Sequence, residues 1–245
     1  MASTTDKIHI LLIHVRESVD MANHERRCIE EVSGLHPDQL TSINVAIDTN
    51  LSSLNLEDFD AVIIGGSGHH SVTQDYPFTQ PLIDAVRTIA KLRIPLLGCC
   101  WGHQFIARAL GGIVVHDPES AEVGNHEVFS TESIADDPIF NACPSQYLVL
   151  MGHEDRVSML PPGAIELAYS HTCRNQAFRF KDLPIYGTQF HTELTPESLV
   201  TRLRLYTKYV SDPAALDRMA ETMQPTPEAA DIILRFLKSI PNYTN

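Results

Sequence analysis

The sequence predicts an α/β protein with a doubly wound, mainly parallel central sheet, helices on both faces and a small β-rich second portion. Within residues 1–112, short apolar runs alternate with amphipathic segments, and this alternation is typical of a parallel sheet. From residue 113 to about 190, short strand-like runs follow one another, separated by turn residues. Helical spacing returns after residue 195, with Ile232, Ile233, Phe236 and Leu237 on one helical face.

The strands expected in the first half are nearly continuous apolar runs, as in strands covered on both faces. They are IHILLIHV (8–15), SINVAID (42–48), DAVIIGG (60–66) and RIPLLGC (93–99), with helices expected at 18–31, 77–92 and 101–112. In the second half the expected strands are GIVVHD, QYLVLMG, AIELAYS, QAFRF and PIYGTQFH. Helices are expected at 196–209 and 227–239, and the Pro- and Met-bearing segment between them is expected to be a connector.

Composition excludes several classes of function. The net charge is −13 over 245 residues, and this disfavours nucleic acid or an anionic membrane as a partner, because both attract clustered Lys and Arg. The apolar run near the N-terminus is too short for a membrane span and suits a buried strand better than a signal peptide. The five cysteines form no CxxC pair, so we expect neither a disulfide framework nor a zinc site, and a cytoplasmic location.

Two adjacent cysteines lie between an apolar run and a helical segment, in GCCWG (98–102). A nucleophile at the end of a parallel strand is commonly held on a sharp strand-to-helix turn, which requires small residues two positions before and after it. Cys100 has Gly98 and Gly102 at these positions, whereas Cys99 has leucine and tryptophan. The spacing therefore selects Cys100, where the helix N-terminus also favours a thiolate. The alternative is that both cysteines are inert core residues.

Among the twelve histidines, His191 has the surroundings expected of a catalytic base. It ends the apolar run in YGTQFHTE, and Glu193 follows two residues later. In an extended chain, residues i and i+2 point to the same side, so the Glu193 carboxylate can hold the imidazole and fix its tautomer. An isolated H-x-E is more often a surface pair, but its occurrence together with GCCWG favours a catalytic site.

The two motifs together resemble the class I glutamine amidotransferase family. Its members carry a strand that ends in G-x-C-x-G-H/A-Q and, later in the chain, Q-F-H-x-E; the matching segments are GCCWGHQ (98–104) and TQFHTE (188–193). The loop IIGGSG (63–68) and the segment MGHEDRV (151–157) resemble two further family elements. The resemblance covers about residues 8–200. It implies one glutamine amidotransferase-like domain over residues 1–245, with a flavodoxin-like core and a C-terminal helical extension over about 201–245.

The resemblance implies cysteine-dependent hydrolysis of the glutamine side-chain amide through a γ-glutamyl thioester. Carried over by position, the family's residues give a nucleophile, a general base and acid, an orienting carboxylate, an oxyanion hole and a substrate pocket. The nucleophile is Cys100, the general base and acid is His191, and the orienting carboxylate is Glu193. The oxyanion hole consists of the backbone N–H groups of Gly66 and Trp101, and the substrate pocket contains Gln104, Ser67 and His153. No metal or organic cofactor is implied. The ammonia would pass to a separate synthetase or acceptor subunit.

Some positions depart from the family's pattern. Trp101 stands where a small or aliphatic residue is usual, and we expect its side chain at the edge of the pocket. Thr192 replaces a proline, and Gly152 replaces a common serine. The pair His69–His70 follows the Gly-rich loop, and two interpretations stay open for it: pocket wall or solvent-facing loop.

Two other functions remain open at this stage. A free-standing γ-glutamyl peptidase or hydrolase acting on glutathione-like compounds would use the same triad. A non-catalytic binding or regulatory module could retain the fold, although the complete Cys, His and Glu set disfavours it. A ThiJ-like protein would share an elbow cysteine, but it is not expected to carry the G-H-Q extension or the late Q-F-H-x-E.

Overall fold

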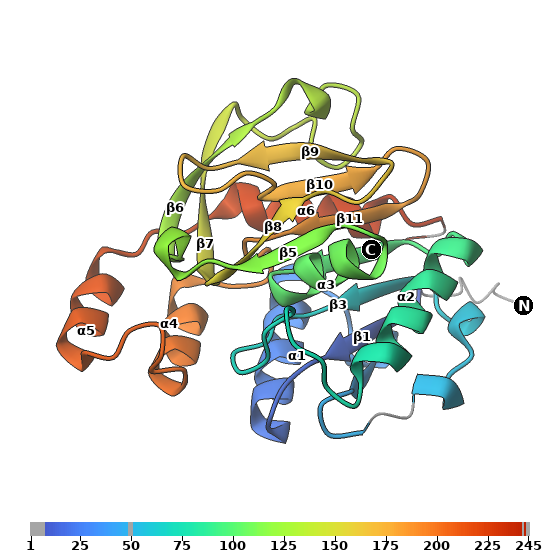
Figure 1. The fold of residues 1–245 in the computed structure, drawn as a ribbon, viewed down its shortest axis with the longest axis horizontal. Coiled ribbons are helices and arrows are strands. Elements are labelled where there is room, and N and C mark those ends of the chain that lie inside the picture. Colours follow the sequence, from blue (N-terminus) through green and yellow to red (C-terminus); the bar gives the residue numbers. More distant parts are fainter. Residues whose placement is uncertain (1–7, 49–50, 242, 244–245) are drawn as a thin grey trace, which may run out of the picture.

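The computed structural model describes residues 8–48, 51–241 and 243. Within these residues the central feature is a nine-stranded sheet in the order β2-β1-β3-β4-β11-β10-β9-β6-β7 (Figure 1). Its strands are β1 (Ile10–His14), β2 (Leu40–Asn44), β3 (Ala61–Ile64), β4 (Leu96–Cys99), β6 (Glu122–Ser130), β7 (Gln146–His153), β9 (Ala164–Tyr169), β10 (Ala177–Phe180) and β11 (Ile185–Thr188). A separate antiparallel pair consists of β5 (Ile113–His116) and β8 (Asp155–Met159).

The sheet has a parallel half and an antiparallel half. Strands β2, β1, β3, β4 and β11 run parallel to one another. Strands β10, β9, β6 and β7 extend the sheet in antiparallel pairing. Because parallel strands end at the same edge, the segments that follow β1, β3, β4 and β11 meet there, and this edge is the usual place for a ligand. The predicted fold class is confirmed.

Helices cover both faces of the sheet (Figure 1). These are α1 (Val19–Ser33) and α6 (Pro227–Lys238) on one face and α2 (Thr79–Leu92) and α3 (Trp101–Ala109) on the other. Helices α4 (Pro196–Leu205) and α5 (Pro213–Thr222) pack against each other at one side of the molecule (Figure 1). Alternation along β1 divides the core: Ile10 and Leu12 pack with residues of α1 and α6, whereas Leu11 and Ile13 pack with residues of α2 and α3. No helix among the described residues is long and apolar enough to cross a membrane.

Several elements differ from the sequence-based expectations. Strand β8 was not expected, and the helix expected at 196–209 ends at Leu205. Strand β2 begins at Leu40 and ends at Asn44, because the chain turns there, with the Ile47 N–H donating to the Asn44 carbonyl at 3.1 Å. Strand β6 was not expected, since its sequence, EVGNHEVFS, has charged and polar residues among apolar ones. The expected connector contains α5, which begins with an Asp212 cap and a first-turn proline. Proline at that position is a helix start signal rather than a helix breaker.

Candidate active site

Cys100 lies in the turn between β4 and α3, at the edge where the parallel strands end. Its φ of 54° and ψ of −105° are strained for a residue with a Cβ atom. A Cβ atom at Gly98 would lie 2.6 Å from the backbone of Gly102, and one at Gly102 would lie 2.2 Å from the Ile64 carbonyl oxygen. The turn therefore requires glycine at both positions, and Cys100 occupies the strand-to-helix elbow that the spacing predicts.

The two adjacent cysteines have different surroundings. Cys99 ends β4 with its Sγ atom 3.4 Å from Thr192 Oγ1, and burial raises the pKa of its thiol. Cys100 instead lines two cavities, and its Sγ atom lies 3.8 Å from both the Gly152 carbonyl oxygen and Gln189 Nε2. Of the two thiols, that of Cys100 is placed to meet a ligand, while Cys99 is a core residue.

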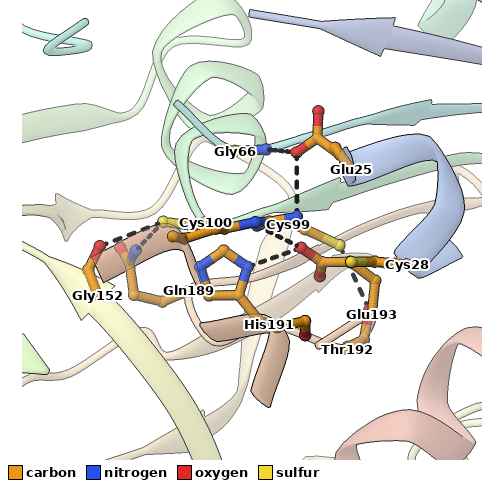
Figure 2. Close-up of polar contacts among 12 residues, drawn as sticks. Glu25, Cys28, Gly66, Cys99, Cys100, Gly152, Gln189, His191, Thr192 and Glu193 are labelled. Atoms are coloured by element: carbon orange, nitrogen blue, oxygen red, sulfur yellow. Dashed lines mark hydrogen bonds and ion pairs between the residues drawn. The ribbon is translucent and has the colours of Figure 1, made fainter. Parts of the chain in front are cut away.

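His191 and Glu193 follow β11 and lie beside Cys100 (Figure 2). The His191 Nδ1 atom is 2.8 Å from Glu193 Oε1. Burial by itself lowers the pKa of His191, but the charge of Glu193 and the contact with Cys100 outweigh it and raise this pKa to about 9. Burial by itself raises the pKa of Glu193, but His191 and Arg202 reverse the effect and lower it to about 2. The two side chains therefore form an imidazolium–carboxylate pair at neutral pH.

A buried charge network, which the sequence analysis did not identify, supports this pair. Arg202, on α4, donates from Nη1 to Glu193 Oε1 at 3.0 Å, and its Nη2 atom lies 3.9 Å from Glu25 Oε1. Glu25, on α1, is fully buried and also pairs with Arg16 and with His14. These residues come from segments far apart in the chain and share no sequence motif, so no sequence signal could have grouped them.

Gly66 is placed as the resemblance implies, but its N–H group is already engaged. A Cβ atom there would lie 3.4 Å from His191 Cε1 and 3.7 Å from Cys100 Cβ. However, the Gly66 N–H donates to Glu25 Oε1 at 3.0 Å (Figure 2). The Gly66 N–H is therefore beside the reacting groups but engaged by a buried carboxylate, and its role as an oxyanion donor stays a prediction.

Trp101 and Gln104 lie in the first turns of α3. The Trp101 N–H belongs to the first helical turn, where N–H groups have no acceptor within the helix. Its indole ring is 2% exposed and stacks on Phe105 at 4.7 Å between ring centroids. Trp101 thus lines the larger of the two cavities at Cys100, as expected, but its indole ring is packed into the core rather than exposed. Gln104 also lines the larger of the two cavities at Cys100, but its Nε2 atom already donates to the Asp155 carbonyl and to Gln189 Oε1.

His153 has both ring nitrogens engaged by neighbouring residues. It is 2% exposed, with Nδ1 3.1 Å from the Asp155 carbonyl oxygen and Nε2 3.1 Å from Glu122 Oε2. The Glu122 carboxylate also accepts a hydrogen bond from Gln176. His153 nevertheless lines the larger of the two cavities at Cys100. Its ring nitrogens join three neighbouring strands, and its role in substrate binding stays a prediction.

The loop that follows β3 forms one wall of the site. Ser67 lines both cavities, and its Oγ atom is 3.1 Å from His70 Nδ1. His70 is half-buried against the rings of Tyr76 and Phe78. His69 lies 3.1 Å from Glu17 Oε2 and lines the larger cavity together with His70. The histidine pair is therefore pocket wall.

Two adjoining cavities open at Cys100. The large cavity has a volume of about 210 Å³, and charged groups of both signs line it, including Glu154, Asp155 and Lys208. The small cavity has a volume of about 30 Å³ and is lined by His191, Arg202 and Tyr206, among others. The residues that line both are Ser67, Cys100, Gly152 and Tyr209. The sulfur atom of Cys100 thus lies where the two cavities join.

The fold and the site define an α/β protein with an elbow cysteine and a histidine–carboxylate pair beside it. The family model described as "Glutamine amidotransferase class-I" matches residues 33–203. The chain belongs to the class I glutamine amidotransferase family.

Relatives with assigned names support this membership. The chain is 34% identical over 156 residues to a protein of Methanothermobacter thermautotrophicus that is named as one subunit of the glutamine-hydrolyzing GMP synthase, covering 64% of this chain and 77% of that protein. It is 38% identical over 138 residues to the glutamine-hydrolyzing GMP synthase of Thermosipho africanus, covering 56% of this chain and 25% of that protein. The matched region thus spans about a quarter of the second relative.

Solved structures share the fold. A glutamine amidotransferase from Thermotoga maritima has a TM-score of 0.75 at 23% identity, covering 95% of this chain and 97% of the other. One from Methylobacillus flagellatus has a TM-score of 0.70 at 20% identity, covering 98% and 97% of the two chains. At these identities the likeness establishes the fold alone.

Proposed function

We propose that the protein hydrolyses the side-chain amide of glutamine through a γ-glutamyl thioester on Cys100. The observation that carries this proposal is the alignment of an elbow cysteine with the His191–Glu193 pair, whose Nδ1–Oε1 distance is 2.8 Å. Family membership gives the substrate class. The large cavity beside Cys100, lined by charges of both signs, suits the amino and carboxylate groups of a γ-glutamyl chain.

In the first half-reaction, the Cys100 thiolate attacks the amide carbonyl carbon. An imidazolium next to a cysteine favours the thiolate, and His191 is protonated at neutral pH because its pKa is about 9. Glu193 occupies Nδ1, so Nε2 is the nitrogen left to transfer a proton. As the C–N bond breaks, His191 gives this proton to the nitrogen, which leaves as ammonia, and the thioester remains.

In the second half-reaction, neutral His191 takes a proton from water, and the resulting hydroxide attacks the thioester carbon. The C–S bond breaks, glutamate leaves, and the Cys100 thiolate and the imidazolium are restored. The oxyanion of each tetrahedral intermediate needs N–H donors. We assign the Trp101 N–H as one donor. The Gly66 N–H can become a second only after it leaves Glu25.

We propose further that the ammonia passes to a separate synthetase-type subunit. One observation supports this: the relatives include proteins named as one subunit of a GMP synthase. The resemblance to the family implies the same role.

The test compares Cys100→Ala with Cys99→Ala, its neighbour in the core. Glutaminase turnover should be abolished in Cys100→Ala and substantially retained in Cys99→Ala. A diazo-ketone analogue of glutamine should add to the wild-type chain at Cys100, as located by peptide mass spectrometry. Labelling at Cys99 with Cys100 free would overturn the proposal.

A further inference from the structure

The segment 206–210, which follows α4, lies beyond the last residue matched by the family model and contributes two tyrosines to the site. Tyr206 is fixed: its hydroxyl donates to Glu17 Oε1 at 2.8 Å and accepts from Arg16 Nη1 at 3.4 Å. Its ring packs directly on Gly68. The Tyr209 N–H donates to the Tyr206 carbonyl at 3.1 Å. This turn places Tyr209 at the junction of the two cavities.

A salt bridge ties the same segment to the far side of the large cavity. Lys208 Nζ lies 3.7 Å from Glu154 Oε2 and 4.6 Å from the centroid of the Tyr209 ring. The backbone of Tyr209 is therefore held by Tyr206, and its ring lies against Lys208. With the backbone fixed in this turn, the ring forms part of the wall of both cavities.

The two cavities have different parts in the reaction. His191 lines the small cavity and not the large one, and it gives its proton to the nitrogen that leaves. The leaving group must therefore lie on the small-cavity side of Cys100. The γ-glutamyl chain must then occupy the large cavity, which has the greater volume and is lined by both carboxylates and a lysine.

The size of the small cavity limits that leaving group. Its volume is about 30 Å³, whereas one water molecule needs about 10–15 Å³ on the same measure. Ammonia is about as large as water and fits. The amine released from a γ-glutamyl peptide is a whole amino acid or dipeptide and does not fit without displacing Tyr206 or Tyr209.

We propose that Tyr209 is a specificity-determining residue that restricts the leaving group to ammonia, so that primary amides react and γ-glutamyl peptides and anilides do not. This inference rests on the proposed function, since it assumes the acyl chemistry at Cys100. It also assigns a role to the segment beyond the family match, which closes the small cavity against larger amines.

The experiment compares hydrolysis of L-glutamine with that of L-γ-glutamyl-p-nitroanilide, in which water releases glutamate and p-nitroaniline. In Tyr209→Ala, the ratio of kcat/KM for the anilide to kcat/KM for glutamine should rise about 10–200-fold, the range that a cavity of altered size provides. Tyr209→Phe keeps the ring and should keep the wild-type ratio. Tyr169→Ala removes a tyrosine that lines neither cavity and should also leave the ratio unchanged.

A second measurement does not depend on turnover. The anilide should protect Cys100 of Tyr209→Ala from the diazo-ketone analogue at a concentration at least about tenfold lower than it does in the wild type. An unchanged ratio and unchanged protection in Tyr209→Ala, with Cys100 still labelled, would overturn this inference alone. Anilide cleavage by the wild type as fast as glutamine cleavage would also overturn it. A wild-type chain that is never labelled at Cys100 would count against the proposed function itself.

Discussion

The carboxylate of Glu25 accepts a hydrogen bond from the backbone N–H of Gly66 at 3.0 Å. It links α1 to the loop beside the elbow cysteine. Glu25 is fully buried and ion-paired with Arg16, so the loop is held by a charged group that has no access to water. The same buried network therefore positions the loop beside Cys100 and contributes to the stability of the fold.

Glu25→Gln should lower the free energy of unfolding by about 3–5 kcal/mol, because it leaves the buried guanidinium of Arg16 without a counter-charge. Urea denaturation followed by circular dichroism measures this. Glu30→Gln is the matched control, since Glu30 pairs with Arg26 on the same helix in a partly exposed position, and its loss should be about 1 kcal/mol or less. Equal losses in the two variants would contradict the assigned role of Glu25.

The pH dependence of turnover should reflect His191. Since its pKa is about 9, kcat/KM for glutamine should fall as the pH rises through about 9, where the proton for the leaving amine is lost. In Glu193→Gln the charge that raises this pKa is gone, so the fall should begin at lower pH. The value of kcat should also drop by roughly 10²–10⁴-fold, with a smaller change in KM.

Glu197→Gln serves as the control for this profile. Glu197 is an acid in the first turn of α4 that lines neither cavity. This variant should keep the wild-type pH profile and kcat. An alkaline limb that stays in place in Glu193→Gln would show that Glu193 does not set the pKa of His191.

Arg202→Gln should act on both stability and the pH profile. The carboxylate of Glu193 keeps its pairing with His191 but loses its second buried cation, and we expect a loss of about 1–3 kcal/mol in the free energy of unfolding. The positive charge of Arg202 opposes protonation of His191, so the alkaline limb should move to higher pH. Arg202→Lys keeps the charge and should restore part of both effects.

Arg204 provides a comparison on the same helix, because it pairs with Asp217 at the surface. Arg204→Gln should leave the pH profile in place and change stability by less than about 1 kcal/mol. A shift of the limb in Arg204→Gln as large as in Arg202→Gln would assign the effect to general surface charge instead.

Gly102→Ala tests the elbow. The added Cβ atom would lie 2.2 Å from the Ile64 carbonyl oxygen, and overpacking of this kind costs about 1–3 kcal/mol. Thermal unfolding should show a lowered Tm, together with loss of glutaminase activity as the turn shifts. Gly152→Ala meets no atom within 4 Å of its Cβ, so its stability should stay within about 0.5 kcal/mol of the wild type. Retained activity in Gly102→Ala would refute the steric argument for Cys100.

The sequence by itself determined the fold class, the elbow at Cys100 and the pairing of His191 with Glu193. Each of these depends on short-range geometry. Two glycines flank the cysteine because the turn brings backbone atoms together locally, and residues two apart in extended chain face the same side. Periodicity likewise indicated most strands and helices, although β6, β8 and α5 lacked the apolar patterns expected of them.

Only the tertiary structure decided which polar groups are free and which are engaged. Gly66 meets Glu25, His153 meets Glu122, and Trp101 packs on Phe105. The first two contacts join elements that are distant in sequence. From the sequence alone, Gly66 and His153 are equally compatible with a site in which their polar groups are free. The volume of the small cavity depends on Tyr206 and Tyr209, which only the packing after α4 brings to Cys100. Burial and hydrogen bonding are properties of the folded surroundings, and no local pattern of residue types specifies them.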